Sequence, residues 1–585
     1  MGTYGDEVIN VETMRTARVP APTVGSVLEE IVASAVECRV YFQPGIYSIR
    51  LDDVRGLDLV LPSRIELWFA RGAEIVLDEG VTLRIRGRII ADPVRVFSLP
   101  EVRDLAMVPG RARVVLEGEE QEEVHPEWFG AVPVLRGDLV GASPLWRRNA
   151  RALQACLHAA CRDRVRDGAP LPPLTVVVRD PLHFDETLDV LPPAGHRGVL
   201  WMRGEDTATR SGTGIAALQR FARGGAGEVD GETSAALRIH PAVSVESSGV
   251  AIKVAVLDDA QGPHPTRDVG CAIAITESSE TPRQRHVFVD AAGLVGGRDA
   301  VVAIIDRERA RPPTDGGSKS RATRYGFRDC TFDLRSGSRS SARTALRLDL
   351  TQDAMVTVTG GVIFQGAAAP QSRIDTEAGV FVRGASVLLR AVSMHLTEGP
   401  RPSRADSGTA RAQPDGQDFW IDSGEGALGS HLSVVHVDSQ SWWLLGARPV
   451  LDKRAVGAVS LLNVGAGNIN WGDPEMEPVR PPEAVSDSVQ QRTLTDPPTI
   501  AWPGGQLPLL IEACSFRRYV TMEPGAQEHA ADVGTVFSLP VEATDEAWWL
   551  SPAAIPSPRR RAVPVLDARA GGRPDALTNM WPRGR

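Results

Sequence analysis

Residues 125–131 read His-Pro-Glu-Trp-Phe-Gly-Ala, and this heptapeptide separates two stretches of different character. Before it, residues 38–90 consist of short apolar segments broken by glycine turns. After it, Ser143-Pro144 supplies an N-cap and a first-turn proline, and apolar residues then recur at helical spacing. The sequence therefore predicts a strand-rich leader, a junction at the heptapeptide and a helix over 145–165.

Alternating apolar and polar residues predict strands on both sides of the junction. At the start of residues 81–90, VTLRIRGRII, the apolar residues Val81, Leu83 and Ile85 alternate with polar ones. This pattern is typical of half-buried strands. Short strands are also predicted at 175–178, 188–191 and 198–204. One coil of such strands cannot bury its apolar face alone, so the pattern favours a solenoid of stacked coils.

A weak internal repeat supports the same architecture. Short segments of similar pattern occur at 327–332 (FRDCTF), 359–364 (TGGVIF), 390–394 (RAVSM), 436–440 (HVDSQ) and 512–516 (EACSF). Their last positions, Phe332, Phe364, Met394 and Gln440, are 32, 30 and 46 residues apart, and the longest interval contains an insertion at 398–417. The repeat predicts an interior stack formed by Cys330, Val362, Val392 and Cys514.

These features together resemble the pectate-lyase-like right-handed parallel β-helix superfamily over about residues 38–520. The strand-Pro-Gly-Tyr segment, PEWFGA, the amphipathic helix and the later coils carry the resemblance, whereas the usual acidic stretch is reduced to Gly137-Asp138. The resemblance implies an all-β solenoid in which Trp128 and Phe129 are packing anchors. We expect a leader (1–124), a junction with a capping helix (125–173), a main β-helix (174–525) and a Pro/Arg-rich C-terminal segment (526–585).

The amino-acid composition limits the classes of binding partner and cofactor that are expected. The formal net charge of −10 argues against a general nucleic-acid binder. The six cysteines contain no CxxC pair, which predicts buried free thiols rather than a metal site or a disulfide framework. No cofactor is expected, and Ca²⁺ enters only as a possibility implied by the superfamily. No membrane span is expected, and the N-terminus lacks a Sec-type apolar region, so we expect a cytoplasmic protein or export by a non-Sec route.

Candidate site residues gather at 417–443. In DFWID and VVHVD the apolar positions are expected to face inward, which would turn the alternating polar positions outward. FWID is similar to the WIDH strand of pectate lyases, with Ser423 in place of the histidine. The sequence makes Asp422, Asp438 and His436 the catalytic candidates and Asp418, Trp420, Trp442 and Trp443 the substrate-binding candidates. The alternative is a set of ordinary solvent-facing residues.

The superfamily contains lyases, hydrolases, epimerases, phage tailspikes and adhesins, so fold alone does not decide function. The sequence lacks the polygalacturonase signature set and also P-loop, HExxH and GxSxG motifs. This favours a binding or structural β-helix protein that engages a polysaccharide or other glycan. One alternative is a polysaccharide lyase or glycoside hydrolase acting on the 418–443 face. Another is a phage-like or injection-system fibre component, expected to be a homotrimer.

Overall fold

The structure is a computed structural model. It describes residues 7–17, 22–34, 36–53, 58–99, 113–133, 143–163, 165–166, 169–170, 172–191, 198–205, 216–222, 234–256, 270–277, 286–297, 299–306, 323–334, 344–350, 354–365, 378–396, 417–422, 430–439, 445–447, 457–462, 464–466, 500–502, 509–512, 515–516, 520–522, 536–538, 542–543 and 549–550. The chain divides into two compact units. Unit 1 comprises Met1–Arg223, Ala235–Lys253 and Arg285–Ala292, and unit 2 comprises Gly224–Ser234, Val254–Gln284 and Gly293–Arg585.

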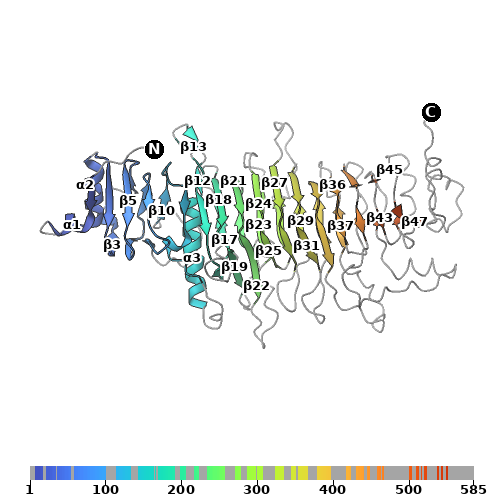
Figure 1. Ribbon diagram of the computed structural model, residues 1–585, viewed down its shortest axis with the longest axis horizontal. Helices are drawn as coiled ribbons and strands as arrows, with labels where there is room; N and C mark the ends of the chain where they lie inside the picture. The colour runs from blue at the N-terminus through green and yellow to red at the C-terminus, as the bar shows by residue number, and fades with distance from the viewer. Residues whose placement is uncertain are drawn as a thin grey trace. The chain divides into compact units, whose positions relative to one another are not determined.

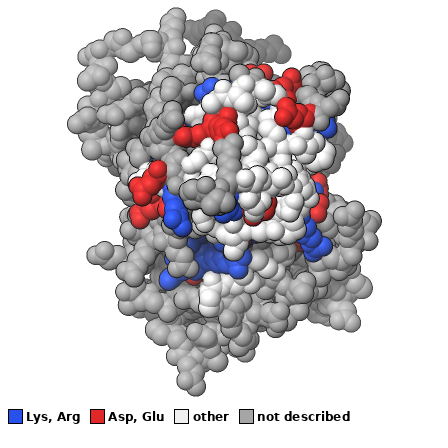
Figure 2. Space-filling view, turned by 90° about the vertical axis from the view of Figure 1, so that its left-hand side faces the viewer, with Lys and Arg blue, Asp and Glu red and all other residues white. Residues whose placement is uncertain are grey.

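Two short helices, α1 (Val11–Thr16) and α2 (Val24–Ala33), follow the first strand of unit 1 and were not expected from the sequence. The Thr23 hydroxyl caps α2 by accepting a hydrogen bond from the Ser26 N–H at 3.2 Å. The apolar face of α2 is buried and contacts the first strands of the leader. Figure 2 views the molecule from the side on which these helices lie, and its described surface is mostly uncharged, with a basic patch below the centre and acidic patches around it. The helices cover strand edges that would otherwise be open.

Three parallel sheets form the leader (Figure 1). Their orders are β1 (Val8–Asn10), β2 (Cys38–Phe42), β5 (Ile65–Phe69) and β8 (Ile89–Ile90); β3 (Gly45–Ile49), β6 (Ala73–Leu77) and β9 (Phe97–Ser98); and β4 (Asp58–Leu61), β7 (Thr82–Ile85) and β10 (Arg113–Leu116), with a single 3₁₀ turn, η1 (Leu51–Asp53), between β3 and β4. The period-two pattern of the sequence is satisfied because alternate side chains of these strands are buried.

An aromatic ladder connects the leader to the junction. The rings of Phe42 and Phe69 stack at 4.7 Å, Phe97 follows at 6.1 Å from Phe69, and Phe129 lies 5.5 Å from Phe97. The junction itself is a 3₁₀ turn, η2 (Pro126–Phe129), in which Trp128 is buried and donates its indole N–H to the Asp92 carbonyl at 3.0 Å. The interpretation of Trp128 and Phe129 as packing anchors is confirmed.

The helix predicted over 145–165 is α3 (Ser143–Ala160), which begins two residues earlier and ends five residues earlier. Its apolar side chains, including Leu153 and Cys156, are buried. The helix packs against β10 of the leader and η2 of the junction, and also against β15 (Thr175–Val178), β16 (Leu182–Phe184) and β17 (Leu188–Val190). Figure 1 shows α3 in cyan between these two sets of strands. The helix is therefore an internal joint of unit 1 rather than a cap with one free side.

The rest of unit 1 continues the parallel stacking. A sheet named here the β11 sheet has the order β11 (Glu123–Val124), β15, β18 (Gly198–Gly204), β21 (Val243–Ser248) and β24 (His286–Asp290). Beside it, β16 pairs with β19 (Ala217–Ala222) and β17 pairs with β20 (Ala235–Ile239). The short segment β12 (Arg162–Asp163) adds antiparallel to β18, and β13 (Val165–Arg166) forms a hairpin with β14 (Ala169–Pro170).

Unit 2 contains three parallel sheets, each named by its first strand; β22 (Ala251–Val256) spans the bounds of the two units. The β23 sheet is β23 (Cys271–Glu277), β26 (Ala300–Asp306), β29 (Thr344–Asp349), β32 (Ala378–Arg383), β35 (Gln417–Asp422), β38 (Leu445–Ala447), β41 (Ile500–Trp502), β44 (Val520–Met522) and β47 (Trp549–Leu550). The β25 sheet is β25 (Gly293–Val295), β28 (Thr331–Asp333), β31 (Val362–Gln365), β34 (Ser393–Leu396), β37 (Asp438–Ser439), β40 (Gly465–Ala466), β43 (Ser515–Phe516) and β46 (Glu542–Ala543). The β27 sheet is β27 (Thr323–Arg328), β30 (Ala354–Thr359), β33 (Ser386–Arg390), β36 (Ser430–Val435), β39 (Gly457–Leu462), β42 (Leu509–Glu512) and β45 (Val536–Ser538).

This stacking confirms the predicted right-handed parallel β-helix. Strand pairing continues beyond residue 525 to β47. The cysteines of the described residues, Cys38, Cys156, Cys161, Cys271 and Cys330, are all buried and free, as predicted, whereas Cys514 lies outside the described residues. In the described part of the chain, no helix combines the length and apolar character needed to span a membrane.

The predicted interior stack is only partly correct, because Cys330 and Val392 are buried whereas Val362 is partly exposed. Phe332 is level with Ile363, and Ile363 with Met394, so the choice of Phe364 was wrong by one residue. Val362 is accordingly level with Thr331 rather than with Cys330. The next coil places Ser439, not Gln440, level with Met394. Coils of 31 residues, from Phe332 to Ile363 and from Ile363 to Met394, replace the unequal intervals expected from the sequence.

Candidate functional site

The outer face of the β23 sheet in unit 2 carries two aromatic side chains on neighbouring strands. Phe381 of β32 is the register partner of Trp420 on β35. Their strand neighbours Val380, Val382, Phe419 and Ile421 have no exposed surface and fill the interior. Because strand side chains alternate, both rings point outward, and both are half-buried. The coil after Trp420 presents Gly446 at the same level, which adds no side chain beside that ring.

Charged side chains lie beside this aromatic pair. Arg347 of β29 is the register partner of Phe381, and Asp349 is the partner of Arg383. The Asp349 carboxylate is 5% exposed, and one of its oxygens lies 3.7 Å from Arg347 Nη2 and 3.6 Å from Arg383 Nη1. The Arg383 guanidinium also lies over the Phe381 ring, 5.4 Å from its centroid. We call Arg347, Asp349, Phe381, Arg383 and Trp420 the Phe381–Trp420 face.

Two of the predicted site residues belong to this region. Trp420 is part of the face, and the backbone of Asp422 is the register partner of Arg383. The side chain of Asp422 lies outside the described residues. The functional roles given to both residues stay predictions.

Asp418 does not point outward as expected. It has no exposed surface, and its carboxylate accepts a hydrogen bond from the Ser439 hydroxyl of β37. The reason is that alternation fails where strands of this sheet begin: β29 and β32 also bury their first three residues. Asp418 occupies a position that is Ala345 in β29 and Gly379 in β32. The expectation that Asp418 faces a ligand was therefore wrong.

His436 lies in a turn rather than on an outward strand position. Its φ of 51° is left-handed, and its N–H donates to the Leu462 carbonyl at 3.0 Å. Left-handed residues recur at the corresponding turns, at Asp329, Gly360 and Ala391, each with an N–H donated to a carbonyl of the next coil. The turn position of His436 is therefore a repeated feature of the coils.

The structure does not assemble the predicted 418–443 face. Asp438 begins β37 of the β25 sheet, whereas Asp422 ends β35 of the β23 sheet. The two residues therefore lie on different sheets of the structure. Trp442 and Trp443 lie outside the described residues.

Four residues of the Phe381–Trp420 face, Arg347, Asp349, Phe381 and Arg383, were not among the candidates expected from the sequence. The signal was present, because RLDL at 347–350 and VFVRG at 380–384 alternate in the same manner as DFWID at 418–422. Without the register, nothing indicated that these segments were neighbours.

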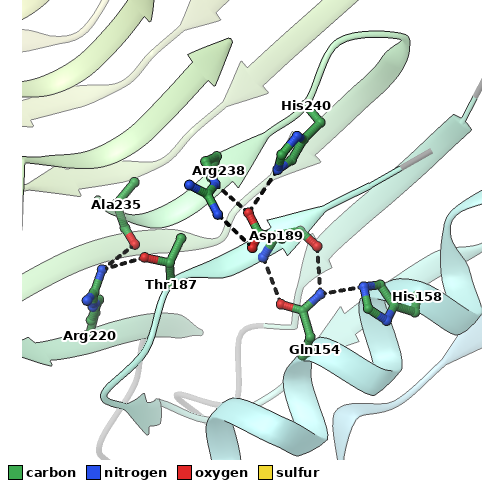
Figure 3. A network of polar contacts seen from close by, with 8 residues as sticks. All are labelled: Gln154, His158, Thr187, Asp189, Arg220, Ala235, Arg238 and His240. Carbon is green, nitrogen blue, oxygen red and sulfur yellow. Dashed lines mark hydrogen bonds and ion pairs between the residues drawn. The ribbon is translucent and has the colours of Figure 1, made fainter. Parts of the chain in front are cut away.

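A second polar cluster lies at the joint formed by α3 in unit 1 (Figure 3). Asp189 of β17 accepts hydrogen bonds from Arg238 of β20, with Nη2 at 2.9 Å from Oδ2, and His240 Nε2 lies 3.0 Å from Oδ1. Burial alone would raise the pKa of Asp189, but hydrogen bonds from His240 and Arg238 and the charge of Arg238 lower it to about 2. Nearby, Arg220 Nη1 donates to Thr187 Oγ1 at 2.8 Å and to the Ala235 carbonyl at 2.7 Å.

Side-chain amides of α3 complete this joint. The Gln154 amide pairs with the backbone of Asp189, and its Nε2 also lies 2.7 Å from Nε2 of His158. Burial lowers the pKa of His158 to about 4, which keeps the ring neutral and able to accept this hydrogen bond. Asn149 bonds in the same manner to the Val132 backbone and to the His183 carbonyl. Because these groups connect neighbouring elements and are largely buried, we assign the cluster to structure.

The junction heptapeptide holds two buried ionisable groups. Burial raises the pKa of Glu127 to about 7, and burial with the nearby Arg179 charge lowers the pKa of His125 to about 4. Oε2 of Glu127 and Nδ1 of His125 have no hydrogen-bond partner among the described residues. Within those residues, no group of three or more His, Cys, Asp or Glu side chains is placed to hold a metal ion.

Comparisons with known proteins identify no family. No family model matches the chain, and no curated protein matches it. Among solved structures, the chain is similar to the enzymatically active domain of tailspike protein 2 from bacteriophage CBA120, with a TM-score of 0.30 and 8% identity. The match covers 68% of this chain and 48% of the tailspike chain, so this protein spans about half the length of that structure.

Proposed function

We propose that the protein binds a glycan on the Phe381–Trp420 face. The observation that carries this proposal is the register of Phe381 with Trp420, which places two outward rings on adjacent strands, roughly 5 Å apart along the sheet. Flat aromatic rings match the apolar C–H face of a sugar ring, and they bury much surface in one contact.

The charged side chains of the face can form hydrogen bonds with the hydroxyl groups at the edge of a sugar ring. Guanidinium groups such as those of Arg347 and Arg383 donate to hydroxyl and carboxylate oxygens in a fixed planar geometry. Both guanidinium groups lie near the Asp349 carboxylate, and that of Arg383 stacks on Phe381, so both are placed beside the rings. A preorganised surface loses less side-chain entropy when a ligand binds.

A glycan array probed with the full chain, followed by calorimetry on each hit, tests the proposal. We expect Trp420→Ala and Phe381→Ala each to weaken binding at least about tenfold, or about 1.4 kcal/mol. Met355→Ala removes a more exposed apolar side chain from β30, on the β27 sheet, and should leave affinity unchanged. Absence of any bound glycan, or full affinity in Trp420→Ala, would contradict the proposal.

The other functions suggested by the sequence have direct tests. Membership of the pectate-lyase-like superfamily is our inference from HPEWFGA and the coils. Cleavage of the bound glycan would appear as shorter products by mass spectrometry, and loss of products in Asp422→Asn would assign them to this face. A fibre role predicts a trimer by light scattering. Binding without products and without a trimer is the outcome that we expect.

A further inference from the structure

A separate row of outward side chains lies on the β11 sheet of unit 1. Trp201 of β18, Glu246 of β21 and Phe288 of β24 are register partners on three successive strands. Their neighbours along the strands, including Leu200, Met202, Val245, Val287 and Val289, are buried. The alternation therefore turns Trp201, Glu246 and Phe288 to the outer face.

The two rings are the most accessible aromatic groups that the structure describes. Trp201 is 38% exposed and Phe288 is 44% exposed, and the other exposed large apolar residues in the described ranges are aliphatic. Two strand spacings separate the rings, roughly 10 Å along the sheet. Exposed aromatic side chains at such a spacing are costly to leave in water and commonly indicate a binding surface.

Glu246 is held between the rings by a histidine. His286 Nε2 lies 3.1 Å from Glu246 Oε1, and the His286 ring lies 5.5 Å from that of Phe288. The backbone N–H of His286 in turn donates to the Ser244 hydroxyl at 3.3 Å. The carboxylate therefore has a defined position, with Oε1 directed to His286.

We propose that Trp201, Glu246 and Phe288 form a binding site for a neutral oligosaccharide. One sugar ring would stack on Trp201 and a second on Phe288, while hydroxyl groups between them donate to Glu246. A carboxylate between the rings disfavours acidic sugars by charge repulsion and accepts hydroxyl donors strongly. Arg203, two residues after Trp201 on β18, has its guanidinium paired with Glu123 at 2.6 Å. This site does not depend on the Phe381–Trp420 face, which lies on the β23 sheet of unit 2.

Saturation-transfer NMR and calorimetry on the full chain, with a panel of uncharged homo-oligosaccharides of one to six sugars, test this site. We expect affinity to rise at least tenfold between the monosaccharide and the shortest oligomer that reaches both rings. Trp201→Ala, Phe288→Ala and Glu246→Ala should each lower that affinity at least tenfold. Met355→Ala is the matched control and should bind as the unaltered chain does.

Trp420→Ala distinguishes this inference from the proposed function. It should leave binding of the neutral oligosaccharide intact even if the Phe381–Trp420 face binds its own glycan. The inference is overturned if no neutral oligosaccharide binds, or if binding survives both Trp201→Ala and Phe288→Ala. It is also overturned if those variants instead abolish self-association in light scattering, because the row would then be an interface between copies of the chain.

Discussion

The side-chain amide of Gln154 makes hydrogen bonds with both backbone polar groups of Asp189. Its Nε2 donates to the Asp189 carbonyl at 2.7 Å, and its Oε1 accepts from the Asp189 N–H at 2.8 Å. A helix side chain thus pairs with the edge of β17 as a neighbouring strand would. Asn149, one and a half turns earlier on α3, bonds to the carbonyl of His183 in β16. Two amides therefore pair with the first strands of two different sheets.

Replacement of Gln154 by leucine should destabilise unit 1. The substitution keeps the size of the side chain and leaves the N–H and carbonyl of Asp189 without these partners, which costs about 2–4 kcal/mol for the two buried groups together. Urea-induced unfolding followed by circular dichroism measures the loss. Arg147→Leu on the same helix is the control, because Arg147 is 58% exposed and its ion pair with Glu186 is long at 3.6 Å. Equal stability of Gln154→Leu and the unaltered protein would contradict the assignment.

Glu127 should make the protein less stable as the pH rises. Burial raises its pKa from 4.5 to about 7, so the folded state retains a proton that the unfolded state has lost. Stability should therefore fall between pH 4.5 and 7, by about 3 kcal/mol in total. The neutral Glu127→Gln variant should equal the unaltered protein near pH 4.5 and exceed it above pH 7. Parallel stability curves for the two proteins across this range would show that Glu127 does not titrate as described.

His158 should have the opposite pH dependence. Burial lowers its pKa from 6.5 to about 4, so the folded state resists a proton that the unfolded state accepts. The stability present above pH 6.5 should be lost progressively toward pH 4, by about 3 kcal/mol. His158→Gln retains an acceptor for Gln154 without titrating, and the difference between the two unfolding curves isolates this contribution. A difference that does not change between pH 7 and pH 4 is the outcome that would count against it.

Gly361 should tolerate no side chain. It has a φ of 83°, and an added Cβ would lie 2.1 Å from the Cys330 carbonyl oxygen of the neighbouring coil. Gly361→Ala should cost at least about 2 kcal/mol of unfolding free energy, since both the backbone and the contact are strained. Ala391→Gly is the comparison, because Ala391 is already left-handed at φ 54° and should change stability by less than about 1 kcal/mol. Similar losses in both variants would contradict this account.

The sequence was sufficient to predict the junction and the β-helix architecture. Local sequence patterns predicted these features, and the structure agrees with them closely. The patterns are HPEWFGA, the helix start at Ser143-Pro144 and the segments of period two. The sequence also contains a signal for the helix α2, because Thr23 precedes apolar residues at helical spacing, namely Val24, Val27, Leu28 and Ile31. Local patterns of this kind need no information about distant parts of the chain.

The register between strands and the composition of the candidate face could not be predicted from the sequence in the same way. Ile363 and Phe364 are adjacent large apolar residues, and alternation alone cannot reveal which of them is level with Phe332. The burial of Asp418 depends on a strand start that alternation does not describe. The candidate face depends on pairings between residues more than thirty positions apart, such as Arg347 with Phe381.

The constant step from Phe332 to Ile363 and on to Met394 has an evolutionary consequence. Because each coil presents the same pairing groups to the next, duplication or loss of one whole 31-residue segment joins strands that already match. A partial segment would instead turn interior side chains toward water. The length of the solenoid can thus change only in steps of one coil, and homologues are expected to differ in length by whole coils.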